Sequence, residues 1–490
     1  MGRKPESQGN ATVSWDDKSY KFPVSFKYAL ITVIVFFGLL LTGTLGFGAS
    51  LELMFLLLWI VVALLVMKLG YKYNEVQNMA WEMGKQSFEP NTIILVVGVM
   101  ISTWMASGTI PFIMYWGLEV ISPQFFLITA LLLTSATSLA TGTSWGTLGT
   151  VGLALMTVGN ALGIPQAMTA GAIICGSFFG DKLTPLSDST ILAATVAGAK
   201  VMSHVKHMLW STVPAYILTA IIFFFLGLKY GKEGSNLQQI DEITSVIAKN
   251  FDLSWISLLP LLIVLVMLVK GIPSIVSLLM GVFSGLAVAV FTQGFNLTKM
   301  FDIMTNGFVI KSGSELVDPI LSRGGLYSLM SSFLVVLLAI CVTGMLEQSG
   351  ILSALVEPLV KRTHGSVFKI TLATMLIALV TNMIGSSMLL TSIVAGSLMK
   401  NVYKNNNLAP ENLSRNIEDV GTMGAPVIPW NSNAIYCSQM LAVSPYAYFP
   451  YVFLAFFVPL FDLIYGATGF AIKKLKPEKL ENVEPATKAI

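Results

Sequence analysis

The stretch that decides the fold is Gly176–Ala199, GSFFGDKLTPLSDSTILAATVAGA, in the middle of a long apolar region. It carries Asp181, Lys182 and Asp188, with Pro185 between the two acids. An Asp or Lys at the centre of a membrane helix costs about 2.5–3.5 kcal/mol. Proline removes a backbone donor and clashes with the preceding turn, so the helix should break here. A broken helix at membrane depth must line a cavity or be buried in protein, so we predict that this stretch forms half of an ion-binding site.

The composition places the chain in a lipid bilayer. Of its 490 residues 54% are hydrophobic and only 11% are charged, whereas soluble domains carry about 25% charged residues. Apolar runs of about 20 residues recur along the chain. The net charge of +3 suggests no nucleic-acid partner. The polar first ten residues, MGRKPESQGN, do not resemble a cleaved signal peptide.

Cysteines and histidines offer little catalytic or metal-binding chemistry. The cysteines lie in apolar surroundings at spacings that fit no zinc site, so we predict that they are packing residues without disulfides. The histidines flank apolar spans, and we predict that they are solvated. No nucleophile–base constellation indicates an enzyme, no cofactor is expected, and no repeated filter motif indicates a channel. These residues are Cys175, Cys341 and Cys437, and His204, His207 and His364.

The chain divides into two apolar halves between polar segments. Lys and Arg cluster in the first and last segments, so both termini are predicted to be cytoplasmic. The predicted parts are an N-terminal arm (1–27), a first half (28–228), a polar connecting loop (229–252), a second half (253–470) and a basic tail (471–490).

Each half contains one apolar stretch with a polar centre and one stretch interrupted by Gly and Pro. The polar-centred stretches, 124–162 and 370–399, have charge patterns that place both ends on one side, so we predict re-entrant hairpins. The interrupted stretches, 163–200 and 416–444, are predicted to be broken crossing helices. Further spans are predicted at 28–47, 51–69, 208–228, 253–269, 272–292, 326–346 and 446–470, with Lys270 on the cytoplasmic side, and at 91–117, where Gly108 and Pro111 interrupt the span.

The two halves resemble each other weakly. Pro185 and Pro429 are 244 positions apart (429 minus 185), and Gly142 and Gly385 are 243 apart (385 minus 142). The first hairpin begins outside and the second inside, so the repeats are predicted to be inverted. The alternative is chance similarity, since small residues are common in packed membrane helices. We predict an all-α polytopic membrane protein with inverted repeats, re-entrant hairpins, broken helices and about 10–12 membrane segments.

A sodium ion needs several oxygen ligands with a negative charge nearby, and a proton can compete for the same carboxylate. The first half supplies the acids and the second half only neutral oxygens. The candidate ion-binding residues are Asp181 and Asp188, which are also the candidate Na⁺ ligands, with Thr143, Ser144, Thr184, Ser187, Thr190, Asn382, Ser386, Ser387, Asn431, Ser432 and Asn433.

Other charged residues near the predicted site have simpler interpretations. Lys182 could neutralise one of the two acids as a structural ion pair. Glu418 and Asp419 precede the second break, where a solvated helix start is favoured over a coupling role. Glu347 is likewise interpreted as a solvated residue at the end of a span.

The motif Gly180-Asp181-Lys182 followed by Pro185-Leu186-Ser187-Asp188 and Thr190 resembles the signature of the NhaC family of bacterial Na⁺/H⁺ antiporters. Thr184 and Ser189 differ from the usual residues but keep a hydroxyl group. The stretches ATGTSWGTLGTVG (140–152) and PVIPWNSNA (426–434) are also similar to family motifs, and the resemblance covers about residues 25–470.

The resemblance implies an ion-transporter-superfamily fold in the cell membrane, with Na⁺ leaving as protons enter by alternating access. Some relatives exchange organic acids such as malate and lactate, so an organic-anion exchanger is the alternative. Lys182 is the only fixed positive charge in the motif, which argues against a dicarboxylate. A homodimer is compatible with such a scaffold.

Overall fold

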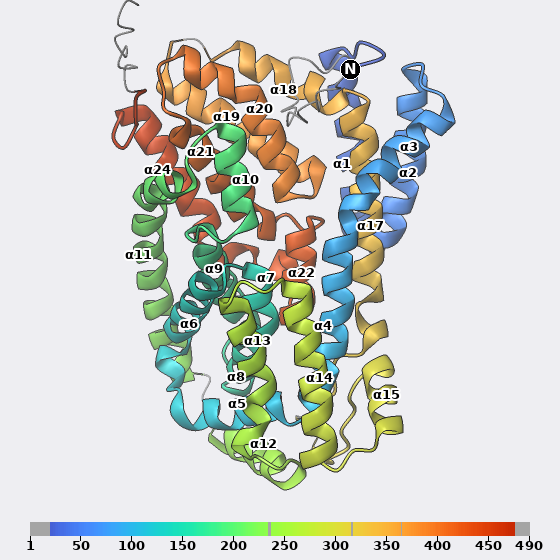
Figure 1. The fold of residues 1–490 in the computed structure, drawn as a ribbon, viewed down its shortest axis with the longest axis vertical. Coiled ribbons are helices and arrows are strands. Elements are labelled where there is room, and N and C mark those ends of the chain that lie inside the picture. The colour runs from blue at the N-terminus through green and yellow to red at the C-terminus, as the bar shows by residue number, and fades with distance from the viewer. Residues whose placement is uncertain (1–19, 234–236, 315–316, 364, 476–490) are drawn as a thin grey trace, which may run out of the picture.

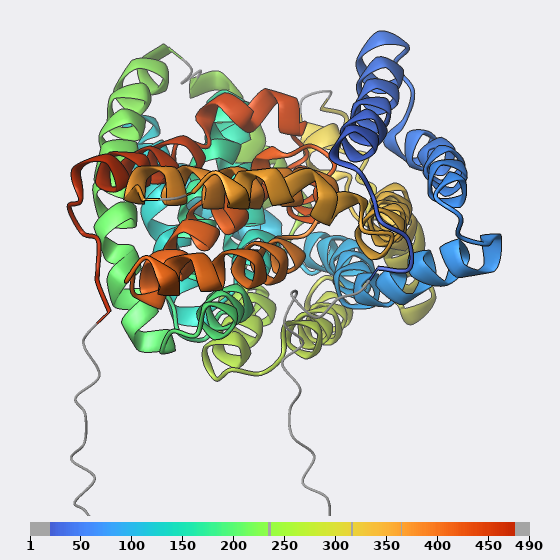
Figure 2. The same cartoon turned by 90° about the horizontal axis from the view of Figure 1, so that it is seen from above.

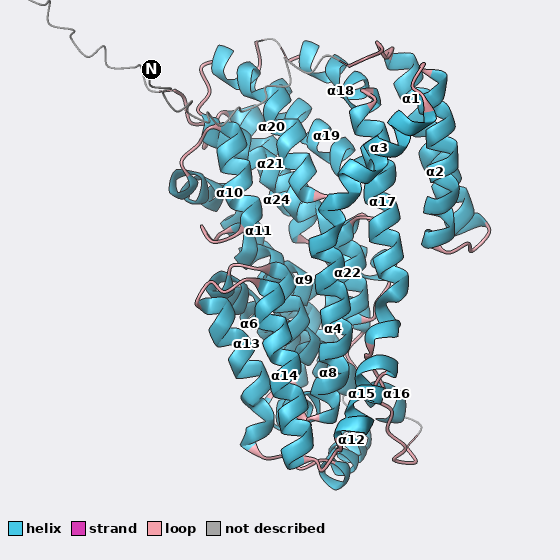
Figure 3. Cartoon of the chain, turned by 45° about the vertical axis from the view of Figure 1, so that its right-hand side comes forward, coloured by secondary structure: helices cyan, strands magenta, loops and turns pink. Residues whose placement is uncertain are grey.

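The structure, a computed structural model, describes residues 20–475 apart from 234–236, 315–316 and 364. These residues form helices and loops, and within them there is no strand beyond an isolated bridge between Leu408 and Lys474 (Figure 3). Eight helices are long and apolar enough to cross a membrane, or up to ten if two bent helix pairs each count as one span. The predicted all-α polytopic membrane fold is confirmed.

The helices of the first half end in the broken pair α9 and α10, and α11 and α12 lead to the second half. The first-half helices are α1 (Phe26–Leu41), α2 (Leu51–Lys68), α3 (Tyr73–Gly84), α4 (Phe88–Ala106), α5 (Thr109–Val120), α6 (Phe126–Thr141), α7 (Ser144–Thr147), α8 (Leu153–Ala161), α9 (Gln166–Lys182) and α10 (Asp188–Ala197). The connecting helices are α11 (Val201–Glu233) and α12 (Leu237–Asn250).

The second half repeats the order of hairpin and broken helix. Its helices are α13 (Leu259–Val269), α14 (Ser274–Thr292), α15 (Leu297–Asn306), α16 (Val317–Leu321), α17 (Met330–Gln348), α18 (Ile351–Lys361), α19 (Val367–Gly385), α20 (Met388–Asn405), α21 (Pro410–Gly424), α22 (Ser432–Leu441), α23 (Pro445–Tyr448) and α24 (Leu454–Thr468).

Two hairpins enter the molecule from opposite ends. The first, α6 with α7–α8, has both ends in the lower part of Figure 1, and the second, α19–α20, has both ends at the top. Their tips lie at mid-height, next to the breaks between α9 and α10 and between α21 and α22. Seen from above, α1 and α2 (blue) lie at one edge, apart from α19–α21 (orange) (Figure 2). The inverted arrangement is confirmed.

The two hairpin tips have the same backbone geometry, at an offset of 244 rather than the predicted 243. Thr143 and Ser387 both have φ −148° and ψ 127°, and each caps the following helix through its hydroxyl oxygen. The preceding residues, Gly142 and Ser386, are both left-handed, with φ 74° and 50°. Matching Gly142 to Gly385 is therefore wrong by one position, because the equivalent left-handed residue in the second hairpin is a serine.

The same offset relates the contacts between each hairpin and its broken helix. The Ser138 hydroxyl donates to the carbonyl of Ser177 (2.5 Å), and the Asn382 amide donates to the carbonyl of Gly421 (2.7 Å). Both pairs shift by 244 positions between the halves. Each hairpin is thus hydrogen-bonded to the helix that breaks beside its tip.

Two predicted elements differ in the structure. The predicted span 272–292 is confirmed as α14, which is long and apolar enough to cross a membrane. The predicted span 253–269 is shorter in the structure, because α13 has only 11 residues, or about 16 Å at 1.5 Å per residue, against a hydrocarbon core of about 30 Å. The helices α13 and α14 form a hairpin in the lower part of Figure 1, with the turn 270–273 between them. The predicted polar loop at 229–252 is mostly helical, since α11 and α12 occupy it.

The tips allow a matched test of backbone strain. Gly142→Ala should destabilise the protein by about 1–2 kcal/mol or more, because the left-handed region is unfavourable for a side chain and the new Cβ would lie 2.8 Å from the Leu186 Cβ. Ser386→Gly should be neutral or stabilising by up to about 1 kcal/mol, since it removes the same strain. Thermal unfolding in detergent measures both changes, and a loss of stability in Ser386→Gly would contradict the equivalence of the tips.

Candidate ion-binding site

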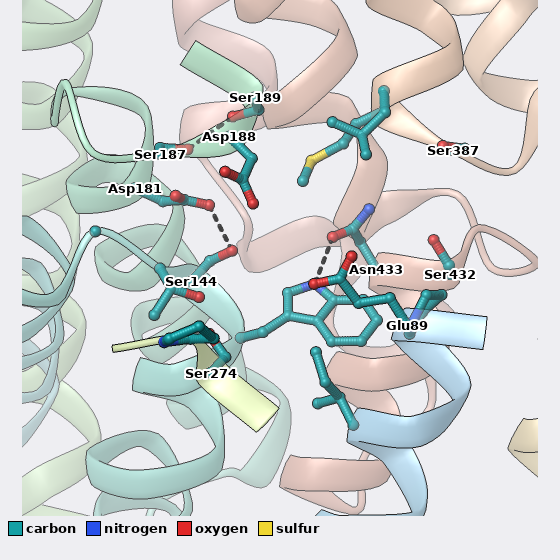
Figure 4. Close-up of a pocket in the computed structure, with 18 of the residues that line it drawn as sticks. Glu89, Ser144, Asp181, Ser187, Asp188, Ser189, Ser274, Ser387, Ser432 and Asn433 are labelled. Atoms are coloured by element: carbon teal, nitrogen blue, oxygen red, sulfur yellow. Dashed lines mark hydrogen bonds between the residues drawn. The ribbon is translucent and has the colours of Figure 1, made fainter. Parts of the chain in front are cut away.

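The hairpin tips and helix breaks surround a central cavity of about 510 Å³. Its walls come from both halves of the chain, and α4 and the α13–α14 turn contribute further lining residues (Figure 4). Most of the predicted site residues line this cavity. They are Thr143, Ser144, Asp181, Ser187, Asp188, Ser387, Ser432 and Asn433.

Asp181 lies in the last turn of α9 and connects the first break to the first hairpin. Its side chain is only 4% exposed, and its Oδ2 accepts a hydrogen bond from the Ser144 hydroxyl (2.7 Å). Ser144 is the first residue of α7, directly after the hairpin tip. The carboxylate is therefore held between two segments that are both interrupted at mid-height.

Asp188 is the first residue of α10, on the other side of the break. Its side chain is exposed within the cavity, and Figure 4 shows its carboxylate on the same side of the cavity as that of Asp181. A carboxylate at a helix N-terminus is stabilised by the unpaired backbone N–H groups and the helix dipole. The Ser187 and Ser189 hydroxyls lie 3.1 Å apart beside it. One accessible and one buried carboxylate thus converge on one space.

Thr184 and Thr190 were predicted to bind the ion, but they do not line the cavity. The Thr184 hydroxyl accepts from the Leu186 N–H (3.3 Å), and the Thr190 hydroxyl donates to the carbonyl of Lys182 (3.1 Å). Both side chains satisfy backbone groups released by the break, so they stabilise the turn around Pro185.

Asn382, Asn431 and Ser386 also lie behind the cavity wall. The Asn431 amide donates to Asn382 Oδ1 (2.9 Å), and Asn431 Oδ1 accepts from the backbone N–H of Asn433 (3.0 Å). The carbonyl of Ser386 accepts from the N–H of Ser432 (3.1 Å). These contacts fasten the second hairpin to the second break.

Among the cavity residues that were not predicted, Trp145 and Glu89 matter most for the site. Trp145 donates through Nε1 to Asn433 Oδ1 (2.8 Å) and stacks on Tyr436 with ring centroids 4.1 Å apart, which joins the two halves across the cavity. Glu89 of α4 adds a third carboxylate to the lining (Figure 4). The only sequence signal for Trp145 is its place in the polar TGTSWG segment, and Glu89 has none.

Lys182 is paired differently from the predicted alternatives. It forms an ion pair with Asp419 of α21, and both side chains are fully buried. The prediction that Glu418 and Asp419 form a solvated helix start is wrong, because both are 0% exposed. Arg415 and Asp462 form a second fully buried ion pair, with Nε and Oδ1 2.8 Å apart. A local motif cannot reveal these pairs, since their members lie far apart in the sequence.

Other solvated assignments also fail. Glu347 is 4% exposed. His204 and His207 are buried, and they contact Ser414 Oγ (2.7 Å) and Asn412 Oδ1 (3.1 Å). The third histidine, His364, lies outside the described residues. The three cysteines are buried and unpaired, as predicted.

Inverted halves that enclose a carboxylate-lined cavity at two helix breaks define a secondary transporter. The model of the Na⁺/H⁺ antiporter family matches residues 24–206 and 176–470. The chain belongs to this family.

Its relatives transport different substrates. The chain is 36% identical to the malate-2H⁺/Na⁺-lactate antiporter of Bacillus subtilis, over 94% of this chain and 100% of that protein. It is 34% identical to the Na⁺/H⁺ antiporter NhaC of Alkalihalophilus pseudofirmus, over 85% and 90%. It is 35% identical to the arginine/ornithine antiporter ArcD of Halobacterium salinarum, over 79% and 80%.

Removing one partner of the buried Lys182–Asp419 pair should strongly destabilise the protein. Lys182→Gln is expected to destabilise the protein by about 3–5 kcal/mol, because Asp419 is left as an unpaired buried charge. Adding Asp419→Asn should restore much of the loss. Thermal unfolding of the two single variants and the double variant measures the coupling.

The exposed pair Lys361–Glu357 is the matched control, since surface pairs contribute only about 0–1 kcal/mol. Equal losses in Lys182→Gln and Lys361→Gln would contradict the role of the buried pair.

Proposed function

We propose that this protein exchanges Na⁺ for H⁺ across the cell membrane by alternating access, with Asp181 and Asp188 as the carboxylates that bind the ions. The observation that carries the proposal is the convergence of these two carboxylates, from either side of one helix break, on a central cavity. Membership of the Na⁺/H⁺ antiporter family supports the same exchange.

The cavity supplies the chemistry that such exchange requires. Hydroxyl oxygens of Ser144 and Ser187 lie beside the two carboxylates, and Asn433 and Ser432 supply neutral oxygens from the other half. Sodium takes the place of water on such oxygens, whereas a proton binds covalently to one carboxylate oxygen. The two ions therefore compete for one negative charge, which couples their movements.

The proposed orientation has both termini in the cytoplasm. Residues 20 and 475, the ends of the described chain, lie at the same end of the molecule in Figure 1. Basic residues such as Lys27 and Lys404 are exposed, and an excess of Lys and Arg marks the cytoplasmic side.

The carboxylates can be tested in proteoliposomes loaded with a pH-sensitive dye. Asp188→Asn and Asp181→Asn should each abolish most Na⁺-dependent proton flux, because an amide neither carries a proton nor neutralises a cation. Glu357→Gln, an exposed acid far from the cavity lining, should retain wild-type flux. Unchanged flux in both Asp variants would refute the site.

A second candidate function is exchange of an organic cation. The cavity of about 510 Å³ is far larger than a single Na⁺ needs. Among the described residues that line it, Glu89, Asp181 and Asp188 are acidic and none is basic. Lys182, the only cation of the motif, is committed to Asp419. The lining therefore favours a substrate with an ammonium or guanidinium group, as arginine and ornithine have, over a dicarboxylate such as malate.

Ligand-induced stabilisation distinguishes these substrates. At a concentration 100 times the dissociation constant, a bound ligand stabilises the folded state by about 2.7 kcal/mol. If the second function holds, arginine or ornithine should raise the melting temperature of the purified protein and lose this effect in Asp188→Asn. Stabilisation by malate or lactate instead would contradict the inference from the cavity charge.

A further inference from the structure

Behind the cavity, α9, α21 and α24 enclose a group of fully buried charges. Lys182 is paired with Asp419, and Arg415 is paired with Asp462 while its Nη1 donates to the carbonyl of Ala471 (3.0 Å). Each cation is thus matched by one carboxylate. Together the four side chains carry no net charge.

Glu418 carries a further carboxyl group, which belongs to neither of these ion pairs. Its side chain is 0% exposed, and neither carboxyl oxygen has a hydrogen-bond partner within the described chain. Thr422, one helical turn further along α21, is 1% exposed, and its hydroxyl interacts with the Glu418 carboxyl. The Thr422 hydroxyl is thus the neutral polar group beside the Glu418 carboxyl in this buried environment.

An ionised carboxylate in this position would be costly. A buried ionised carboxylate loses the stabilisation that water gives to its charge, whereas a protonated carboxyl group has no net charge and loses much less. Lys182 acts on Glu418 electrostatically, but it already neutralises Asp419. Burial therefore favours the protonated form of Glu418 over the ionised form.

The titratable groups around Glu418 come from several helices, and among the acids within the described chain Asp181 and Asp188 likewise form no ion pair. Asp181 reaches the cavity, whereas Glu418 does not line it. The groups on the helices packed against α21 include Lys182 and Asp181 (α9), Asp188 (α10), His204, Lys206, His207 and Tyr216 (α11), Tyr403, Lys400 and Lys404 (α20), Lys369 (α19), and Asp462 and Tyr465 (α24), with Glu411, Arg415 and Asp419 on α21 itself.

We propose that Glu418 is a second proton-binding site, behind the ion site, and that Na⁺ binding at Asp181 and Asp188 expels its proton. This step rests on the proposed Na⁺/H⁺ exchange. Sodium brings one positive charge next to Asp181, which acts electrostatically on Glu418. The O–H bond of Glu418 then breaks, the electron pair stays on the carboxylate, and the proton leaves to water. One positive charge enters the buried region and one leaves, so the charge balances.

The coupling is reciprocal. If Na⁺ weakens proton binding at Glu418, then protonation of Glu418 weakens Na⁺ binding by the same factor. Over the pH range in which Glu418 titrates, its proton should change the Na⁺ affinity by up to about tenfold per pH unit. A buried carboxyl group with a purely structural role would show no such dependence.

Glu418→Gln in the full-length protein tests the proposal, because glutamine keeps the shape but cannot release a proton. The Na⁺ dissociation constant is measured across pH, and the slope of its logarithm against pH should be smaller than in the wild type by up to about one. Glu418→Asp, which keeps the acid, should retain the wild-type slope. A wild-type slope in Glu418→Gln would overturn the proposal.

Infrared difference spectroscopy of the wild type, with and without Na⁺, gives a readout that needs no variant to fold. A protonated-carboxyl C=O band should disappear on adding Na⁺, and it should shift when only the glutamates carry ¹³C. A band that does not shift, or no band in a protein that binds Na⁺, would overturn the role of Glu418. Absence of Na⁺ binding to the wild type would instead refute the proposed exchange itself.

Discussion

The structure depends on satisfying the backbone groups that two helix breaks leave unpaired at mid-height. In a bilayer such groups cannot bond to water, and each one left bare costs several kcal/mol. The first hairpin bonds to α9 through Ser138, and the second bonds to α21 through Asn382. Thr190 then pairs with a carbonyl inside the first break. The breaks are stable because each hairpin supplies a hydrogen bond to the broken helix beside its tip.

The two halves share this backbone arrangement but contribute different side chains to the site. At equivalent positions the first half has Asp181 and Asp188, and the second has Ala425 and Ser432. Asn431 caps α22 through Oδ1, which accepts from the Asn433 N–H, and donates through Nδ2 to Asn382, so its oxygen is not free for an ion. Charge is concentrated in one break, while the other break is closed by neutral hydrogen bonds. Only one half can then respond strongly to a cation.

The breaks, the hairpins and the inverted order could be predicted from the sequence because each has a local signal. Pro185 interrupts a helix wherever it stands, and Gly142 marks a left-handed turn. The hairpin register was one residue out because Ser386 adopts the left-handed conformation without being a glycine. The length of α13 was missed because most of the stretch 253–269 is apolar, and composition alone does not show where its helix begins.

The buried charges could not be predicted, because their environment depends on partners distant in the sequence. Lys182 and Asp419 are 237 positions apart, and no local pattern distinguishes a buried Asp419 from a solvated one. Thr184 and Thr190 were assigned to the ion because hydroxyl groups suit either a cation or a backbone group. The choice between these partners is decided by where the turn places each side chain, which the residue type alone does not determine.

The Lys182–Asp419 pair also constrains how the cavity can change its access. Separating these buried charges would cost about 3–5 kcal/mol, so α9 and α21 are held together, and each carries its hairpin with it. The cavity walls outside this group come from α4, the α13–α14 turn and α17, through Glu89, Ser274 and Ile340. Relative movement between these walls and the group of hairpins and broken helices would leave both buried ion pairs intact. The ion site and the charges behind it would then move together. Asp181 and Glu418 would keep their relative positions when the cavity opens to the other side of the membrane, so the electrostatic link between them would persist.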